Sequence, residues 1–483
     1  MQIFGLEYAH VATANGPFPS IINEQGEFTH DMFWRFVRGI ASGLERDGVN
    51  ENALLAFTSN NLVTVLAVMI ATSLRGARLI VAEPAVARAG IGKPSHFYRT
   101  AEMKGGKKFR VIDKAWLEQT DPDNQQRWLN PRATPESEWL CLHTSGTTGR
   151  EKYFYLTQRM VLERSRARAQ DFPFQQTVLA SPANVMSRLY WARALGTLLQ
   201  AGALIDSFDL EFWIKSGVNL VVGSPTQVFD FFKSDRLPRK FPRTEIGGAK
   251  LPDETIRHLL KHFDVIVDSY GAAETNKSFE NRITLGPDGT IQRSGVLLDS
   301  QVEISSEDGK PCSPGEMGTV RVKNPYMIKG YLNSAEATAR VFSDGWFYPG
   351  DLATWGDNHE LVIIGRNDDV INLGGYKLNA GLLDMFFSQV KGIKEAIVFQ
   401  NPKSKAVSKA LILAVFEADV ARFEVMELAC ELARHKLGVL LSPDAFRPVT
   451  AIPKTLDGDP DRKACRAMVL KYSQAQAEAE DND

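Results

Sequence analysis

Cysteine is scarce in this sequence, and the few cysteines are scattered. They are Cys141, Cys312, Cys430 and Cys465. They form no CxxC pair and no cluster with histidine, which argues against a zinc site or a disulfide framework and favours a reducing cytoplasm.

Net charge is also lacking. A formal charge of -2 gives no global field that would attract nucleic acid or an anionic membrane, so we expect neither partner.

Long apolar segments are absent as well. The longest apolar run, from Leu62 to Leu74, is too short to span a bilayer. It follows Asn60 and Asn61, which are good helix caps, so we expect a buried helix there. The first ten residues show no basic and then apolar signal pattern. We therefore expect a cytoplasmic protein without a membrane span.

The alternation of local patterns indicates an α/β fold class. At 483 residues the chain is longer than one hydrophobic core usually organises, so we expect more than one domain. Between residues 30 and 300, helical patterns alternate with short apolar runs such as NLVVGS and VIVDSYG, as in layered sheets covered by helices. From about Ser294, alternating segments with turns predict an antiparallel, barrel-like subdomain.

A smaller α/β unit is expected near the C-terminus. The sequence predicts a helix from about Asn379, strands in EAIVFQ and ALILAVF, and a helix over 422–436. We place the domain boundary at Asp368, which gives an N-terminal domain (1–367) and a small, mobile C-terminal domain (368–472). The remaining segment, 473–483, is acidic and rich in small residues, so we expect disorder there.

The strongest local signal is the segment LHTSGTTGREK at residues 142–152, which follows an apolar strand pattern. Glycines let a backbone approach a phosphate, hydroxyl and N–H groups donate hydrogen bonds, and the final lysine supplies positive charge. The spacing differs from GxxxxGK[ST], so this is no ordinary P-loop. We interpret the segment as a phosphate-binding loop.

This loop resembles the signature of the acyl-adenylate-forming superfamily, which includes acyl-CoA synthetases, peptide-synthetase adenylation domains, amide ligases and luciferases. Further segments resemble the later motifs of that superfamily and occur in the same order. They are GGAK (247–250), DSYGAAE (268–274), GEMG (315–318) with GY (330–331), GWFYPGD (345–351), GRNDDVIN (365–372) with GG (374–375), and IPKTLDGDPDRKA (452–464). The resemblance covers nearly the whole chain.

The resemblance implies an ATP site that uses Mg²⁺. The phosphate loop and Lys152 would close over the β- and γ-phosphates, and Glu274 would coordinate Mg²⁺. Asp351 would accept hydrogen bonds from the ribose hydroxyls, and Arg366 would approach the ribose and the phosphates. The nucleotide-binding residues implied in this way are Thr144, Ser145, Gly146, Thr147, Thr148, Gly149, Gly248, Ala249, Lys250, Ser269, Tyr270, Gly271, Ala272, Ala273, Asp351 and Arg366.

The resemblance also implies a pocket for a carboxylic acid and a mobile domain. Arg188 and Arg193 could pair with a polar acid, although solvated arginines are commoner. Asp368 would be the hinge of the mobile domain. The pocket residues would be Asn184, Val185, Ser224, Pro225, Gly247 and Gly248. The small residues Ala183, Ser224, Gly247 and Gly248 could admit a ring or a short chain, although helix packing alone explains them equally well. Gly374 and Gly375 would face the acceptor tunnel, although a plain glycine turn explains them nearly as well.

The C-terminal motif departs from the superfamily pattern. An alignment without gaps places Asp459 where the superfamily carries its adenylation lysine, and an aspartate there adds repulsion where charge must be neutralised. Lys463 or Lys454 could take its place, adenylation could be slow, or that half-reaction could be lost. Two milder departures are Ala273 in place of a threonine and Gln158 in place of a histidine.

We therefore predict a ligase that activates a carboxylic acid as acyl-AMP, with release of pyrophosphate, and then transfers the acyl group to CoA. Its catalytic residues would be Lys152, Glu274, Arg366 and, in place of the usual lysine, Lys463. An amine or a carrier protein is the alternative acceptor. A nucleotide-binding protein that has lost adenylation is an alternative of another class, against which Glu274, Asp351 and Arg366 argue. An oxygenase resembling luciferases has no support in the sequence.

Overall fold

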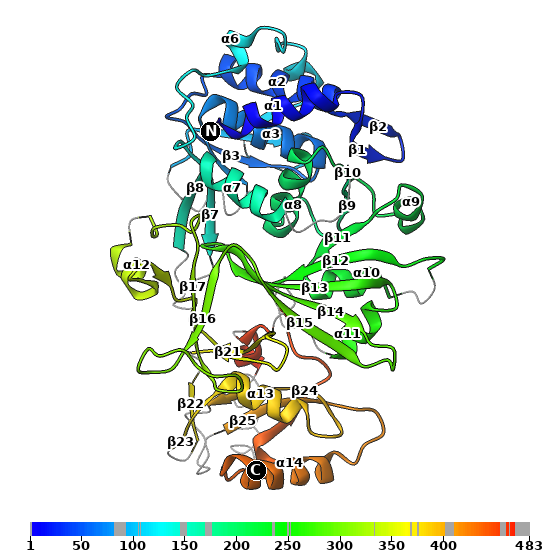
Figure 1. Ribbon diagram of the computed structural model, residues 1–483, viewed down its shortest axis with the longest axis vertical. Coiled ribbons are helices and arrows are strands. Elements are labelled where there is room, and N and C mark those ends of the chain that lie inside the picture. Colours follow the sequence, from blue (N-terminus) through cyan, green and yellow to red (C-terminus); the bar gives the residue numbers. More distant parts are fainter. Residues whose placement is uncertain are drawn as a thin grey trace, which may run out of the picture. The chain divides into compact units, whose positions relative to one another are not determined.

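The computed structural model describes the chain except for residues 1, 82–92, 105, 107, 145–151, 170–175, 234–236, 249–250, 252, 333, 368–369, 374–375, 401–409, 455–459, 463 and 469–483. The chain divides into two compact units, which are described separately (Figure 1). The first contains residues 1–247, 251–301 and 323–347, and the second contains 248–250, 302–322 and 348–483. The predicted boundary at Asp368 lies outside the described residues and stays a prediction.

A mostly parallel sheet forms the larger layer of the first unit (Figure 1). In the described part of the chain its strand order is β15-β14-β13-β12-β11-β9-β10-β1-β2. Within this sheet, neighbouring strands from β1 through β10, β9, β11 and β12 to β13 pair in parallel. Strand β2 pairs antiparallel with β1, and β14 pairs antiparallel with both β13 and β15. The bounds are β1 (Pro19–Asn23), β2 (Gly26–Thr29), β9 (Val178–Ala180), β10 (Ala203–Ile205), β11 (Leu220–Gly223), β12 (Phe241–Gly247), β13 (Phe263–Ala272), β14 (Asn276–Leu285) and β15 (Ile291–Leu297).

A second sheet of the first unit has the order β6-β5-β3-β4-β7-β8 in the described residues. The bounds are β3 (Leu54–Thr58), β4 (Arg78–Val81), β5 (His96–Thr100), β6 (Arg110–Ile112), β7 (Glu138–Thr144) and β8 (Lys152–Thr157). All neighbours pair in parallel except β7 and β8, which are antiparallel and flank the predicted phosphate loop. Thr144 and Lys152 are register partners, so the two ends of that loop lie side by side.

Helices cover these sheets. The predicted buried helix is confirmed as α3 (Leu62–Arg75): the Asn61 side chain accepts a hydrogen bond from Thr64 N at 2.8 Å, and the helix ends at Gly76, whose φ is 66°. None of the described helices has the length and apolar character that a membrane crossing requires. The other helices of this unit are α1 (Phe4–Asn15), α2 (His30–Arg46), α5 (Lys114–Leu117), α6 (Gln125–Trp128), α7 (Gln158–Ala169), α8 (Arg188–Leu199), α9 (Leu210–Lys215), α10 (Pro225–Phe231), α11 (Asp253–Leu259) and α12 (Ala335–Val341). A short hairpin, β18 (Phe342–Ser343) with β19 (Trp346–Phe347), follows α12.

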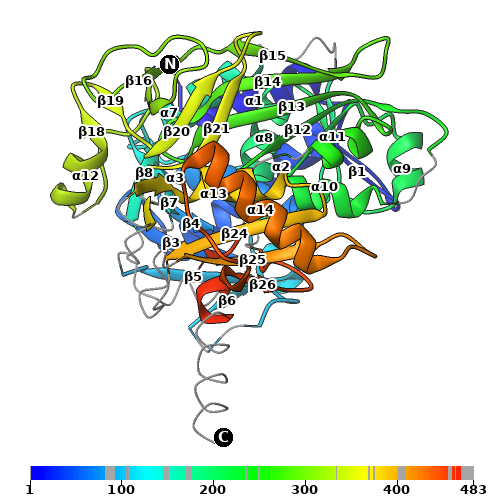
Figure 2. The ribbon, with the colours of Figure 1, turned by 90° about the horizontal axis from the view of Figure 1, so that it is seen from below.

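The second unit contains the antiparallel strands expected after Ser294 and a compact α/β portion. The strands are β16 (Gln301–Ser305), β17 (Gly318–Lys323), β20 (Asp351–Trp355), β21 (Leu361–Arg366), β22 (Val370–Leu373), β23 (Tyr376–Asn379), β24 (Ile393–Gln400), β25 (Ala410–Phe416) and β26 (Phe446–Pro448). The helices are α13 (Ala380–Ser388), α14 (Arg422–Leu437) and the 3₁₀ turn η1 (Pro443–Ala445). Figure 2 shows α14 running across β24 and β25, and Ala429 and Ala433 of α14 share a core with Ile412. The predicted α/β class is confirmed.

Candidate active site

Predicted pocket residues lie where neighbouring parallel strands end. In the sheet order, β9, β11 and β12 are consecutive neighbours. Asn184 and Val185 follow β9, Ser224 and Pro225 follow β11, and Gly247 ends β12. The carboxyl ends of parallel strands meet at one edge of a sheet, and in open α/β sheets this edge binds ligands. The fold therefore gathers these five residues at one edge.

Local bonds already occupy some of these side chains. The Ser224 hydroxyl accepts a hydrogen bond from Gln227 N at 3.3 Å, and the Gln227 side chain accepts one from Ser224 N at 3.0 Å, so the pair forms a capping box at the start of α10. Pro225 occupies the first turn of that helix. The Asn184 amide donates to the Asn60 side chain at 3.1 Å. Helix capping thus explains Ser224 and Pro225 without a ligand.

Tyr331 joins the two charged residues expected to handle the phosphates. Its hydroxyl donates to Oε1 of Glu274 at 2.6 Å, and the Glu274 side chain is buried. The Lys152 ammonium lies 5.0 Å from the centre of the Tyr331 ring, within the range of a cation–π contact. Lys152 and Glu274, 122 positions apart in the sequence, therefore contact the same side chain. The sequence motif around Gly330 and Tyr331 suggested no role for this tyrosine.

Arg164 of α7 holds the turn that carries Glu274. Its Nη1 donates to the carbonyl of Ala273 at 3.0 Å and its Nη2 donates to the carbonyl of Glu274 at 2.8 Å. Its Nε and Nη2 also donate to the carbonyl of Tyr326, at 3.1 and 3.0 Å. Arg164 is buried, so these bonds form away from water and fix the backbone of the turn. Sequence analysis missed this residue, because an arginine on a helix usually lies in solvent.

Strand β13 places the DSYGAAE residues between β12 and β14. Ser269 lies beside Gly247 on one side and Glu280 on the other, and a bulge follows between Tyr270 and Gly271. A Cβ atom on Gly271 would lie 2.1 Å from the backbone oxygen of Asn276, so only glycine fits there. Ala272 ends the strand, and Ala273 and Glu274 follow in the turn that Arg164 holds.

Asp268, which opens the DSYGAAE segment, is a titratable group within β13. Burial raises the pKa of its carboxyl to about 6, although a hydrogen bond from Asn281 and the charge of Arg293 partly offset that rise. The carboxyl therefore changes charge near neutral pH.

In the second unit, the two residues predicted to bind the ribose contact each other. Asp351 opens β20, Arg366 ends β21, and the two are register partners. Nη1 of Arg366 donates to the Asp351 carboxylate at 2.8 Å. The φ of Gly350 is 84°, and a Cβ atom there would lie 2.9 Å from the Arg366 guanidinium. The Asn379 amide donates to the carbonyl of Arg366, which fixes the end of the strand.

Two described residues of the divergent C-terminal motif, one on either side of Asp459, have defined partners in the second unit. Lys454 forms an ion pair with Glu395, so its charge is engaged there. Arg462 forms an ion pair with Asp384 and donates to the carbonyl of Val398 at 3.1 Å. These contacts fix both ends of the segment that contains Asp459.

Other predicted site residues cannot be placed. Those outside the described residues are Ser145, Gly146, Thr147, Thr148, Gly149, Ala249, Lys250, Asp368, Gly374, Gly375, Asp459 and Lys463, together with the side chain of Thr144. Gly248 is described and has a φ of 93°. No group of three or more metal-ligating side chains occurs in the part of the chain that the structure describes. A magnesium ion at Glu274 would therefore need oxygen ligands from the nucleotide or water, which is usual for Mg²⁺.

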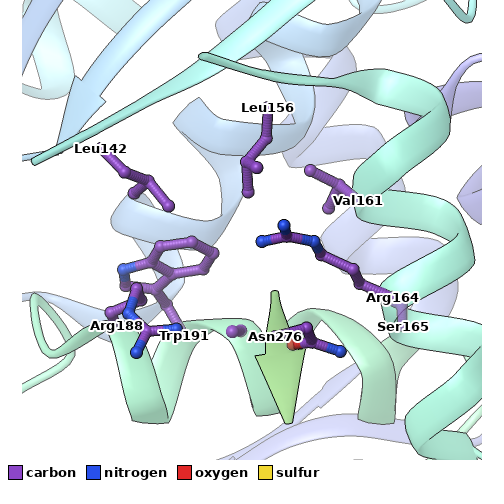
Figure 3. Close-up of a pocket in the computed structure, with 9 residues that line it drawn as sticks. Leu142, Leu156, Val161, Arg164, Ser165, Arg188, Trp191 and Asn276 are labelled. Carbon is purple, nitrogen blue, oxygen red and sulfur yellow. The ribbon is translucent and has the colours of Figure 1, made fainter. Parts of the chain in front are cut away.

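A small cavity lies beside the Glu274 turn (Figure 3). Its described lining comes from β7, β8, α7, α8 and the start of β14, and it includes Arg164, Arg188, Trp191 and Asn276. In Figure 3 the Arg164 guanidinium and the Trp191 indole point into the same space. The cavity volume open to the centre of a water molecule is about 20 Å³. This is roughly enough for one water.

A family model described as AMP-binding enzyme matches residues 8–332. The chain belongs to this family. The predicted membership of the acyl-adenylate-forming superfamily is thus confirmed, as is the prediction of a ligase. Use of ATP is expected of AMP-binding enzymes.

Curated relatives of this AMP-binding enzyme use several acids. A feruloyl-CoA synthase of an Amycolatopsis species is 28% identical over 475 residues, which cover 90% of this chain and 94% of that relative. A 2-succinylbenzoate–CoA ligase of Bacillus licheniformis is 29% identical and covers 73% of this chain and 74% of the relative. A 2-hydroxy-7-methoxy-5-methyl-1-naphthoate–CoA ligase of Streptomyces carzinostaticus is 30% identical, but the match spans only 37% of this chain and 32% of that protein.

Solved structures share the fold. ATP-bound MatB from Rhodopseudomonas palustris superposes with a TM-score of 0.79 and 19% identity, covering 97% of this chain and 99% of that one. The amide bond synthetase McbA from Marinactinospora thermotolerans gives a TM-score of 0.77 and 19% identity, covering 96% and 99%. At these identities the likeness concerns the fold alone.

Proposed function

We propose that this AMP-binding enzyme activates a carboxylic acid with ATP, forming an acyl adenylate and pyrophosphate, and then transfers the acyl group to the thiol of CoA. The observation that carries the proposal is the contact of Lys152 and Glu274 with Tyr331. It brings a cation and a buried carboxylate to one place beside the phosphate loop, where a triphosphate would need both charge neutralisation and a metal ligand.

Glu274 fits a role in holding Mg²⁺. Its carboxylate is a hard oxygen ligand, it is buried, and the Tyr331 hydroxyl orients it. When bound, the ion would neutralise charge on the phosphate oxygens and so ease attack by the carboxylate. Lys152 would add a fixed positive charge at the end of the phosphate loop. Arg164 keeps Glu274 in place through its hydrogen bonds to the backbone of the turn.

Asp351 and Arg366 would recognise the nucleoside. The Asp351 carboxylate is oriented by the Arg366 guanidinium at 2.8 Å, and a carboxylate accepts hydrogen bonds from two ribose hydroxyls well. Arg366 would then lie near enough to the ribose to reach an adjacent phosphate oxygen. This assignment predicts that both residues act in the binding of ATP.

Adenylation must proceed although Asp459 stands where a lysine is usual. We propose that Lys463 supplies the missing charge from its own position and that adenylation is slower than in the superfamily generally. Lys454 is a poorer candidate because Glu395 already neutralises it. Loss of one well-placed charge contact typically costs about 100-fold or more in rate.

CoA is the acceptor we favour, because the feruloyl-CoA synthase matches over 90% of this chain and the 2-succinylbenzoate–CoA ligase over 73% of it, whereas a D-alanyl carrier protein ligase of Lacticaseibacillus casei matches over 69%. The first experiment is acid-dependent release of pyrophosphate from ATP and Mg²⁺, measured over aryl, short-chain and long-chain acids, each with and without CoA. We expect release with at least one acid and a CoA-dependent increase with thioester product. Amide or carrier-protein products in place of the thioester would change the acceptor, and ATP binding without release would indicate a protein that has lost adenylation.

A further inference from the structure

One face of the large sheet carries buried charged side chains next to the edge where the acid is expected. Cross-strand partners point to the same face of a sheet. Three rows of partners run across β12, β13 and β14 there. They are Glu245–Val267–Arg282, Gly247–Ser269–Glu280 and, beyond the bulge, Gly271–Lys277. Gly247 is itself a predicted pocket residue, so the charged rows adjoin the pocket.

These charges form a connected cluster. The Lys277 ammonium lies 3.1 Å from the Glu280 carboxylate and 3.8 Å from the Glu245 carboxylate. Arg193 of α8 forms an ion pair with Glu245, and Arg243 lies 3.5 Å from Glu280. Each of these five side chains is at most 8% exposed. Arg193, for which the sequence favoured a solvated position, is therefore buried and paired.

Positive charge predominates in and around this cluster. Its five buried members are three cations and two carboxylates, and Arg282, 42% exposed, adds a cation 2.7 Å from Glu280. The cavity of Figure 3 is lined by Ala192 and Asn276, which precede Arg193 and Lys277 in the chain. Its described lining includes Arg164 and Arg188 but no acid. Glu274 is the carboxylate in the neighbouring turn, and we assign it to Mg²⁺. Buried charge of one sign favours a counter-ion.

Ser269 provides an independent observation. It lies in the middle row, between Gly247 and Glu280. Its hydroxyl oxygen is buried and has no hydrogen-bond partner among the described residues. A buried polar group without a partner destabilises the fold, so such a group in a native protein calls for an explanation such as a bound ion, a water or a catalytic role. A polar ligand group is therefore expected beside this row.

We infer that this cluster recognises a second negatively charged group on the acid, and that the substrate is a dicarboxylic acid. The inference rests on the proposed function, because it takes the acid to bind at the ends of β9, β11 and β12. One carboxylate would be adenylated, and the other would receive hydrogen bonds from Lys277 and Ser269. Glu245 and Glu280 hold the lysine in position. Cations outnumber carboxylates among the named cluster members, so a second carboxylate suits this place better than a neutral group.

The test compares acids that differ only in the second group. Dicarboxylic acids of several lengths are compared with their monoamides in acid-dependent pyrophosphate release. We expect a preference in kcat/KM of roughly 10- to 100-fold for one dicarboxylic acid over its monoamide, the value of hydrogen bonds to a charged group. Lys277→Met should abolish most of this preference, and Lys277→Arg should restore part of it. Lys310→Met, at a side chain 80% exposed, should leave the preference intact.

The outcomes separate this inference from the proposed function. Release with several acids but equal kcat/KM for dicarboxylic acids and monoamides overturns the inference and leaves the proposed function standing. The same holds for a preference for amino-bearing acids that Glu245→Gln removes. If no acid gives release, the proposed function fails, and calorimetry then decides: binding of a dicarboxylic acid that Lys277→Met weakens supports the subsite, and absence of binding overturns it. The comparison of acids on the unmodified protein requires no variant to fold.

Discussion

Removing the hydroxyl of Tyr331 tests the arrangement at the phosphate end of the site. This hydroxyl donates to Glu274 at 2.6 Å, and the acceptor is a buried carboxylate. A hydrogen bond to a charged group contributes about 1.5–3 kcal/mol. Tyr331→Phe keeps the aromatic ring beside Lys152 and removes only this bond. It therefore isolates the orientation of the Glu274 carboxylate from the packing of the ring.

We expect the Mg²⁺ concentration at half-maximal pyrophosphate release to rise by roughly tenfold or more, because loss of a group that orients a metal ligand typically costs 10- to 100-fold in affinity. The temperature of unfolding of the first unit should fall by roughly 2–4 °C. The assay is a titration of Mg²⁺ at saturating ATP and acid, with calorimetry in parallel. An unchanged or lower Mg²⁺ requirement would refute the reasoning, because it would mean that the tyrosine does not position the ligand or competes with the ion.

Tyr98→Phe is a matched control. The Tyr98 hydroxyl also donates to a carboxylate, that of Asp47, at 2.9 Å, and Tyr98 is fully buried. Asp47 keeps other donors, among them Trp116 at 3.0 Å and Arg110 at 2.7 Å, so the loss of stability should be smaller. We expect no change in the Mg²⁺ requirement. A shift as large as that of Tyr331→Phe would mean that general destabilisation explains both variants.

Four further predictions follow from single residues. Glu274→Gln should lower pyrophosphate release by about 100-fold or more, and excess Mg²⁺ should not restore it. Asp351→Asn should raise the KM for ATP by roughly 10-fold or more, and an unchanged KM would remove Asp351 from the nucleotide site. Lys454→Ala should change the rate of release by less than about fivefold, because Glu395 already neutralises this lysine. The pKa of Asp268 is raised to about 6, against 3.8 for an ordinary aspartate, so the folded state favours the protonated carboxyl. The free energy of unfolding therefore falls as the pH rises from 3.8 to 6, and it stays lower at higher pH. Asp268→Asn should therefore stabilise the protein at pH 7 by up to about 3 kcal/mol and have little effect at pH 4, which unfolding at the two pH values would measure.

Features set by local sequence were predictable. The run from Leu62 to Leu74 with its asparagine caps became α3, because an apolar run, a cap and a terminal glycine act within one helix. The strands in EAIVFQ and ALILAVF and the helix over 422–436 correspond to β24, β25 and α14 for the same reason.

Contacts between distant residues could not be predicted. The bond from Tyr331 to Glu274 joins positions 57 apart, and Arg164 reaches a turn 109 residues away. In the sequence, Arg164 is one of several arginines on a polar helix, so no local signal separates it from its solvated neighbours. Ser224 was interpreted as a small pocket residue, yet its hydroxyl caps α10. Such roles depend on which strands become neighbours, and that is decided by the packing of the whole sheet.

The structure also limits how the chain can compensate for Asp459. If the segment slid by four positions to put Lys463 in its place, Cys465 would move out of a core in which it is fully buried with Ile452. The ion pair of Arg462 with Asp384 would break as well. The buried apolar contacts and the ion pair together stabilise the present register by several kcal/mol. This is on the order of the transition-state stabilisation that one catalytic charge contact provides. A register shift therefore gains nothing, which is why we propose that Lys463 acts without one.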